Sequence, residues 1–136
     1  MPRAPLPPEL ERFVAAPRPA VVGTVRPDGA PVTTAVWYGW LGEGRVLLSM
    51  DAQGPRQRNL RNNTRIALTI LGESWYDHVS ILGRVVEFRD DSDLADLDAL
   101  SVRYEGQPYE DRSITPVSAI VEIERWHTWG DPGSQA

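Results

Sequence analysis

The 136-residue chain contains no cysteine and no lysine, and its only histidines are His78 and His127. The absence of cysteine excludes disulfides, thiolate metal ligands and a cysteine nucleophile. The absence of lysine excludes Schiff-base chemistry, including covalent pyridoxal phosphate catalysis. Two histidines are too few for a histidine-rich metal centre, so we expect no metal site.

Long apolar runs and an excess of positive charge are also missing. No window approaches the ~20 apolar residues of a membrane span, and the N-terminus lacks the apolar core of a signal peptide. The formal net charge of -5 argues against non-specific binding to nucleic acid. We therefore expect a cytoplasmic protein with no membrane or nucleic-acid partner.

The length suits one domain with a real hydrophobic core. We expect a single domain over residues 1–136, with a flexible, proline-rich N-terminus at 1–7 and a flexible C-terminus at 130–136. Apolar residues at helical spacing predict a short helix over 8–16. A second helix should end the arginine-rich segment near 62–63, and a third is predicted over 91–104.

The remaining chain is a series of apolar, β-branched segments separated by turn residues. Gly83 interrupts the longest of them, which predicts a bulge or bend there. Strands that follow one another closely, with helices only at the margins, predict an all-β fold with minor helices: a small, nearly closed barrel of six to seven mostly antiparallel strands. The expected strands are 20–25, 32–40, 45–50, 64–71, 76–89 and 117–124, the last with an extension over 126–129.

Four arginines fall within ten residues, in the run GPRQRNLRNNTR, although the chain as a whole is acidic. They lie between two predicted strands, so their charge is held close to the core. A guanidinium can donate two parallel hydrogen bonds to phosphate oxygens. We interpret Arg56 and Arg58 as a phosphate clamp at the start of a helix. Arg61 and Arg65 are expected to be surface or ion-paired residues.

The order of these features resembles the split-barrel flavin and deazaflavin oxidoreductases, the pyridoxamine 5′-phosphate oxidase-like superfamily, and within it the F420-dependent branch. The segments AVVGTVRPDGAPVTTAVWYGW, VLLSMDAQGPRQRNLRNNTRIALTI, HVSILGRVVEF and RWHTW carry the likeness. Together they cover about residues 12–129. The deazaflavin branch commonly has a lysine three residues before the Asn of Arg-Asn-Leu, where this chain has Arg56.

The resemblance implies a cofactor site, and these roles are expectations drawn from it. Ser49 and Met50 would touch the ribityl phosphate arm, Asn59 would hold the loop or cap the helix, and Thr33, Thr34 and Val36 would lie against the ring system. Trp37, Trp75 and Trp129 are candidates for the walls of the ring groove. Tyr76 and His78 are the candidate proton donors, and nothing in the sequence selects between them and water.

The resemblance further implies a homodimer with cofactor sites at the subunit interface. The expected cofactor is coenzyme F420, with FMN as the alternative. The expected activity is hydride transfer between the reduced coenzyme and a small carbonyl-activated substrate, such as an enone or a quinone. The alternatives are an FMN-dependent oxidoreductase, a non-catalytic deazaflavin or flavin carrier, and a haem-handling protein that would rely on His127.

Overall fold

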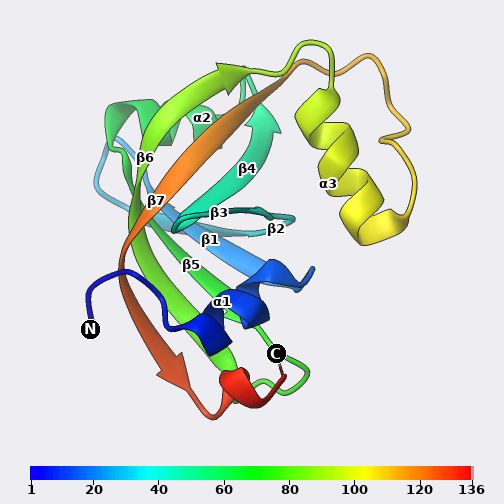
Figure 1. The fold of residues 1–136 in the computed structure, drawn as a ribbon. Helices are drawn as coiled ribbons and strands as arrows, with labels where there is room; N and C mark the ends of the chain where they lie inside the picture. The colour runs from blue at the N-terminus through cyan, green and yellow to red at the C-terminus, as the bar shows by residue number, and fades with distance from the viewer. Residues whose placement is uncertain (136) are drawn as a thin grey trace.

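The computed structural model describes residues 1–135 and is built mostly of β-strands (Figure 1). Most predicted elements are found within a few residues of their expected bounds. Its elements, in chain order, are α1 (Pro8–Ala15), β1 (Ala20–Val25), β2 (Pro31–Val36), β3 (Gly39–Gly42), β4 (Arg45–Asp51), α2 (Pro55–Asn62), β5 (Arg65–Leu71), β6 (His78–Asp90), α3 (Ala95–Glu105), β7 (Pro116–Trp129) and the 3-10 helix η1 (Pro132–Gln135).

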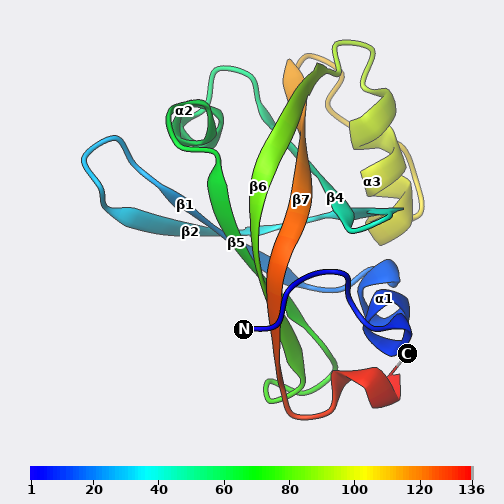
Figure 2. The same cartoon turned by 60° about the vertical axis from the view of Figure 1, so that its left-hand side comes forward.

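All seven strands form one antiparallel sheet with the order β2-β1-β5-β6-β7-β4-β3. The two edge strands, β2 and β3, are neighbours in the sequence and are joined by only Trp37 and Tyr38. The sheet must therefore curl so that the end of β2 meets the start of β3, while the hairpin of β1 and β2 projects away from the rest of the sheet (Figure 2). This confirms the predicted all-β fold.

The segment 32–40 was predicted to be one strand, and this is wrong. The strand breaks at Trp37 and Tyr38, where the chain passes from one edge of the sheet to the other. The Tyr38 side chain is completely buried. Its hydroxyl lies 2.8 Å from the Val14 carbonyl oxygen and 2.9 Å from that of Ala16, at the end of α1. Uniformly high β-propensity through this segment hides the break, which is set by tertiary packing.

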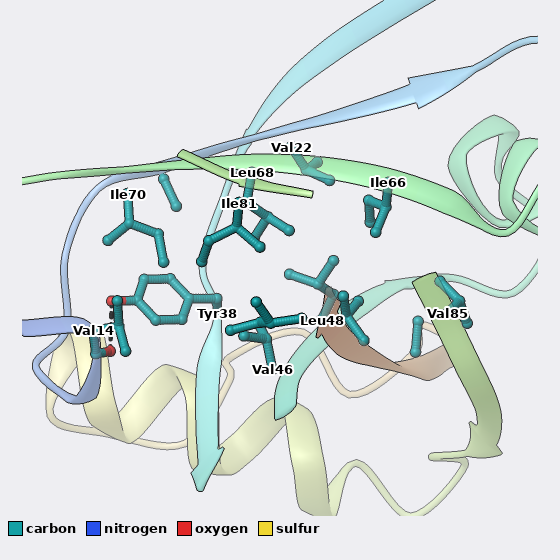
Figure 3. Close-up of a cluster of buried hydrophobic side chains, with 14 of the residues drawn as sticks. Val14, Val22, Tyr38, Val46, Leu48, Ile66, Leu68, Ile70, Ile81 and Val85 are labelled. Atoms are coloured by element: carbon teal, nitrogen blue, oxygen red, sulfur yellow. Dashed lines mark hydrogen bonds between the residues drawn. The ribbon is translucent and has the colours of Figure 1, made fainter. Parts of the chain in front are cut away.

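The core fills the inside of the curled sheet (Figure 3). Buried and partly exposed residues alternate along β1 and β5, as expected for strands with one face on the core. Tyr38 and Val14 contribute from outside the regular strands, beside aliphatic residues such as Leu48 and Leu68. A smaller second cluster joins Leu47, Leu100 and Ile120 under α3.

β6 and β7 are the longest strands and pair along their whole length, with two register shifts. The first lies between Leu82 and Gly83, which confirms the predicted irregularity at Gly83. A Cβ at Gly83 would stand 2.5 Å from the Glu122 carbonyl oxygen, so only glycine allows this approach. The extra residue is Glu124 on β7, because Leu82 pairs with Arg125 and Gly83 with Ile123.

The third helix begins at Ala95, four residues after its predicted start at 91. Asp91 lies before the helix and is buried. Its carboxylate accepts hydrogen bonds from the backbone N–H groups of Asp96 at 2.8 Å and Leu97 at 3.0 Å. The acidic residue that suggested a helix start therefore binds the first turn from outside it.

The two ends of the chain, which were expected to be flexible, both contact the sheet. Ala4 and Trp126 donate backbone hydrogen bonds that tie residues 2–4 to β7. Leu6 is buried in the core. At the other end, the Gln135 side chain donates to the Asp77 carboxylate at 2.8 Å, which holds η1 against the turn before β6.

Candidate functional site

The arginine-rich segment forms α2, directly after β4. Gly54 is the N-cap, Pro55 opens the helix, no side chain caps it and its first turn has no acidic residue. Arg56 and Arg58 therefore place positive charge at the positive end of the helix dipole, which is unfavourable unless an anion is present. The local sequence favours anion binding at the expense of helix stability.

Arg56 is partly buried and has few partners. Its Nη1 atom donates to the Ser49 carbonyl oxygen at the long distance of 3.4 Å. Its Nε atom is buried with no hydrogen-bond partner. Arg56 belongs to none of the ion pairs found among residues 1–135. Burial lowers the pKa of this guanidinium, so the protein bears a cost for keeping it charged.

The other polar residues of α2 and of the start of β5 have different surroundings. Arg58 is exposed and donates to the Gln53 carbonyl oxygen at 2.7 Å. Asn59 is buried, and its amide donates to the Thr24 hydroxyl at 3.2 Å, so it ties α2 to β1 and does not cap the helix. Arg61 stacks over the Phe88 ring at 4.2 Å, and Arg65 is exposed at the start of β5.

Two cavities meet at Arg56. One has a volume of about 660 Å³ and the other of about 700 Å³, and Asp51 and Arg56 line both. Together they form a groove that begins at α2 and ends beside α3. The first cavity is lined by Ala35, Val36, Trp37, Ser49, Met50, Leu97, Leu100, Tyr109, Ile114, Thr115 and Pro116, and the second by Thr24, Arg26, Pro27, Val32, Thr34, Gly54, Pro55, Arg58 and Asn59.

The groove runs along β2, which is a sheet edge. Alternate residues of this strand, Val32, Thr34 and Val36, line the cavities. Thr33, predicted to touch the ring, lines neither of them and projects from the other face of β2, because successive residues of a strand point to opposite sides. Ala35 also borders the first cavity, at the point where β2 ends and the strand pattern breaks.

Most of the predicted cofactor residues are brought together here. Thr34, Val36, Ser49, Met50, Arg56, Arg58 and Asn59 all line the groove. The groove changes character along its length: guanidinium, hydroxyl and amide groups surround the α2 end, while aromatic and aliphatic side chains surround the α3 end. Such a site suits an amphipathic ligand with an anionic part and a flat apolar part.

The predicted proton donors and two of the predicted tryptophans lie outside this groove. Trp75, Tyr76, His78 and Trp129 line neither cavity. They belong to the start of β6, the turn before it and the end of β7, and these strand ends lie at the bottom of Figure 1. His78 pairs with Trp129 across the two strands, and its Nδ1 lies 3.1 Å from the Trp75 carbonyl oxygen. Trp75 is 84% exposed and Trp129 57%.

The residues that close the α3 end of the groove were not predicted. Leu97 and Leu100 have the three-residue spacing of a helix face, which indicates only packing. Tyr109 and Ile114 belong to the segment 105–116, predicted to be a polar loop, and both line the cavity. A tyrosine and an isoleucine in an otherwise polar loop were the only available signal.

The described part of the chain has neither a membrane-spanning helix nor a metal-binding cluster. No helix within residues 1–135 is both long and apolar enough to cross a bilayer. Those residues also contain no group of three or more histidine, aspartate or glutamate side chains arranged to hold a metal ion.

Comparison with known proteins gives one family and many similar folds. The family model described as pyridoxamine 5′-phosphate oxidase matches residues 6–130. A solved structure described as an F420 reductase is 25% identical, with a TM-score of 0.81 over 90% of this chain and 98% of that one. No curated protein matches the chain.

Two further solved structures share the fold at lower identity. A conserved hypothetical protein from Mycobacterium tuberculosis is 22% identical, with a TM-score of 0.71 over 98% of this chain and 90% of that one. General stress protein 26 from Bacillus anthracis is 15% identical, with a TM-score of 0.66 over 89% of this chain and 91% of that one.

Proposed function

Because the chain belongs to the pyridoxamine 5′-phosphate oxidase family, we propose that it is an F420-dependent oxidoreductase that reduces small carbonyl-activated compounds such as enones or quinones. The family and its neighbours indicate an oxidoreductase that uses a flavin-type cofactor. The choice of the deazaflavin is supported by the similarity to a structure described as an F420 reductase.

The proposal rests on the environment of the Arg56 guanidinium. A partly buried guanidinium with an unpartnered Nε atom and no carboxylate partner lies where the two cavities meet. A phosphate seated there would accept hydrogen bonds from Arg56 and offset the helix dipole that Arg56 opposes. Arg58 and the free backbone N–H groups of the first turn of α2 would supply further donors. The residues present therefore fit the phosphate arm of the coenzyme.

The remaining groove residues would orient the coenzyme and exclude water. The alternate side chains of β2, Thr34 and Val36, would lie along the ring system, with Ser49 and Met50 beside the arm. A bound reduced deazaflavin supplies a hydride. A quinone that accepts the hydride and one proton becomes a hydroquinone, so it gains two electrons as the coenzyme loses two. Tyr76, His78 and water remain the candidate proton sources.

A homodimer is part of the proposal. The aromatic residues Trp75, Tyr76 and Trp129 are large and exposed, and they gather at one end of β6 and β7. Exposed apolar side chains that cluster in this way commonly mark an interface. A second copy would cover them and bring His78 of the partner subunit towards the groove. Sedimentation velocity would show a two-subunit species, and a monomer at micromolar concentration would refute this arrangement.

The experiment that tests the proposal is a fluorescence titration of the purified protein with F420, FMN and FAD. The double variant Arg56→Ala/Arg58→Ala should weaken coenzyme binding by about 3–6 kcal/mol, because two charge-assisted contacts are lost. Arg65→Ala is the matched control, since it removes an exposed arginine outside both cavities.

Each outcome of this titration has a distinct meaning. Tighter binding of FMN than of F420 would show that the coenzyme is FMN, and the proposed binding site would be unchanged. Equal affinity in the wild type and the double variant would refute the phosphate clamp. If the protein binds a coenzyme in the titration but reduces no enone or quinone in a turnover assay, it is a coenzyme carrier.

A further inference from the structure

We infer that the α3 end of the groove receives the hydride acceptor, and that it selects neutral, flat, apolar molecules. This inference rests on the proposed function. The walls there are Trp37, Leu97, Leu100, Tyr109 and Ile114. Among residues 1–135, the only charged residues that line this cavity are Asp51 and Arg56, and both also line the second cavity. An ionic substituent at the α3 end would lose its hydration without gaining a partner.

Trp37 forms a rigid wall of this end. Its ring stacks on Tyr104 with a centroid distance of 5.5 Å and an interplanar angle of 9°. The Tyr104 hydroxyl donates to the Arg18 carbonyl oxygen at 2.8 Å, so the stacking partner is itself fixed. Trp37 also packs against the small core cluster that includes Leu100. The indole plane is therefore set by the fold before any ligand binds.

Tyr109 faces Trp37 from the loop between α3 and β7. The two rings meet edge to face, with centroids 6.3 Å apart and an interplanar angle of 82°. A flat acceptor can pack against the two aromatic rings and the leucines of α3, and this shape favours quinones and cyclic enones over long flexible chains.

An ion pair fixes the position of Tyr109. Arg112 donates to both carboxylate oxygens of Asp98, at 2.7 and 3.1 Å. Asp98 also accepts from the Tyr109 backbone N–H at 3.0 Å, and Arg112 donates to the Tyr109 carbonyl oxygen at 3.0 Å. Both backbone polar groups of Tyr109 are thus bound by the pair. The hydrogen bonds from Arg112 lower the pKa of Asp98, so the pair stays charged at neutral pH.

The Asp98–Arg112 pair therefore positions Tyr109, which forms part of the wall of the acceptor site. Without the pair, the loop would still connect α3 to β7, but the Tyr109 ring would no longer be held opposite Trp37. Loss of the pair should weaken acceptor binding and leave coenzyme binding unchanged, because the pair lies outside both cavities.

The test compares menadione with naphthoquinone sulfonate, which has a similar bicyclic core and a negative charge. The protein is loaded with the coenzyme that the titration above identifies. For the wild type we expect kcat/KM for menadione to exceed that for the sulfonate by about tenfold or more. Equal values would overturn the inference.

Variants of Tyr109 and Arg112 then test whether this preference for menadione depends on the Tyr109 ring. Tyr109→Ala should raise the KM for menadione about tenfold with kcat nearly unchanged, and Tyr109→Phe, which keeps the ring, should stay within about twofold of the wild type. Arg112→Gln should raise the KM by a smaller factor, and Arg112→Lys should restore part of it. Arg84→Gln, which breaks an exposed ion pair with Glu124 on the sheet, is the control and should change nothing.

The coenzyme affinity of each variant separates this inference from the proposed function. If Tyr109→Ala weakens coenzyme binding and leaves the KM for menadione unchanged, the cavity holds the coenzyme ring and the inference is wrong. If the wild type binds coenzyme but reduces neither quinone, calorimetry with menadione decides, and absence of binding overturns the inference. Failure of the wild type to bind any coenzyme refutes the proposed function instead.

Discussion

Arg56 and Arg103 are both partly buried guanidinium groups, but they lie at opposite kinds of helix end. Arg103 donates to the Ala15 carbonyl oxygen at 2.8 Å and to that of Ala16 at 2.9 Å, at the C-terminal end of α1. Arg56 lies in the first turn of α2 and has one long hydrogen bond, to the Ser49 carbonyl oxygen. The charge of Arg103 complements the negative end of the α1 dipole, whereas the charge of Arg56 opposes the positive end of the α2 dipole.

Arg103 therefore serves the stability of the fold, whereas Arg56 is available for binding. Arg103 also lies over the Tyr38 ring at 5.1 Å, so it joins α1, α3 and the break between β2 and β3. Removing it should damage the fold. Arg56 has no comparable partners and borders both cavities, so removing it should damage ligand binding and little else.

The largest effect on stability is expected for Arg103→Ala. The substitution removes the donor of the Ala15 carbonyl oxygen and one of the two donors near that of Ala16. It also removes the cation from the Tyr38 ring. We expect a loss of about 2–4 kcal/mol in the free energy of unfolding, measured by urea denaturation. A loss below about 0.5 kcal/mol, within the range of an ordinary surface substitution, would break the comparison.

Tyr38→Phe should have the next largest effect. Burial raises the pKa of the Tyr38 hydroxyl, which therefore stays protonated, and its one hydrogen lies within reach of the Val14 and Ala16 carbonyl oxygens. Loss of that donor should cost about 1–2 kcal/mol of unfolding free energy. The aromatic ring is kept, so the core should not rearrange. An unchanged unfolding midpoint would show that the hydroxyl does not hold α1 to the sheet.

Arg56→Met should have the smallest effect and the opposite sign. Methionine keeps part of the apolar stem and removes a charge that is desolvated and opposes the helix dipole. We expect the ligand-free protein to gain about 0.5–1 kcal/mol in unfolding free energy. The same urea experiment measures this change. Destabilisation by more than about 1 kcal/mol would mean that Arg56 serves the fold, as Arg103 does.

Much of the fold was predictable from the sequence, because the strands alternate in polarity and turn residues separate them. The break at Trp37 and Tyr38 was not, since both residues have high β-propensity and only the burial of Tyr38 under α1 forces the chain to leave the sheet. The start of α3 was misplaced for a related reason. Asp91 looks like the first residue of a helix, but it binds the first turn from outside.

The site was predictable only in part. The α2 end could be found because arginines in an acidic chain are conspicuous and lie between strands. The α3 end could not, because it depends on Tyr109, whose position is fixed by an ion pair between residues 98 and 112 that no local pattern reveals. Trp75, Tyr76, His78 and Trp129 meet at the far end of the sheet, and only a second copy of the chain could bring them to the groove.

The most direct test of the central claim is a crystal structure of the protein with F420 bound. The account predicts a phosphate oxygen within hydrogen-bonding distance of Arg56, with the unpartnered Nε atom as one of its donors. A coenzyme whose phosphate lies away from α2, with Arg56 unchanged beside Ser49, would contradict it.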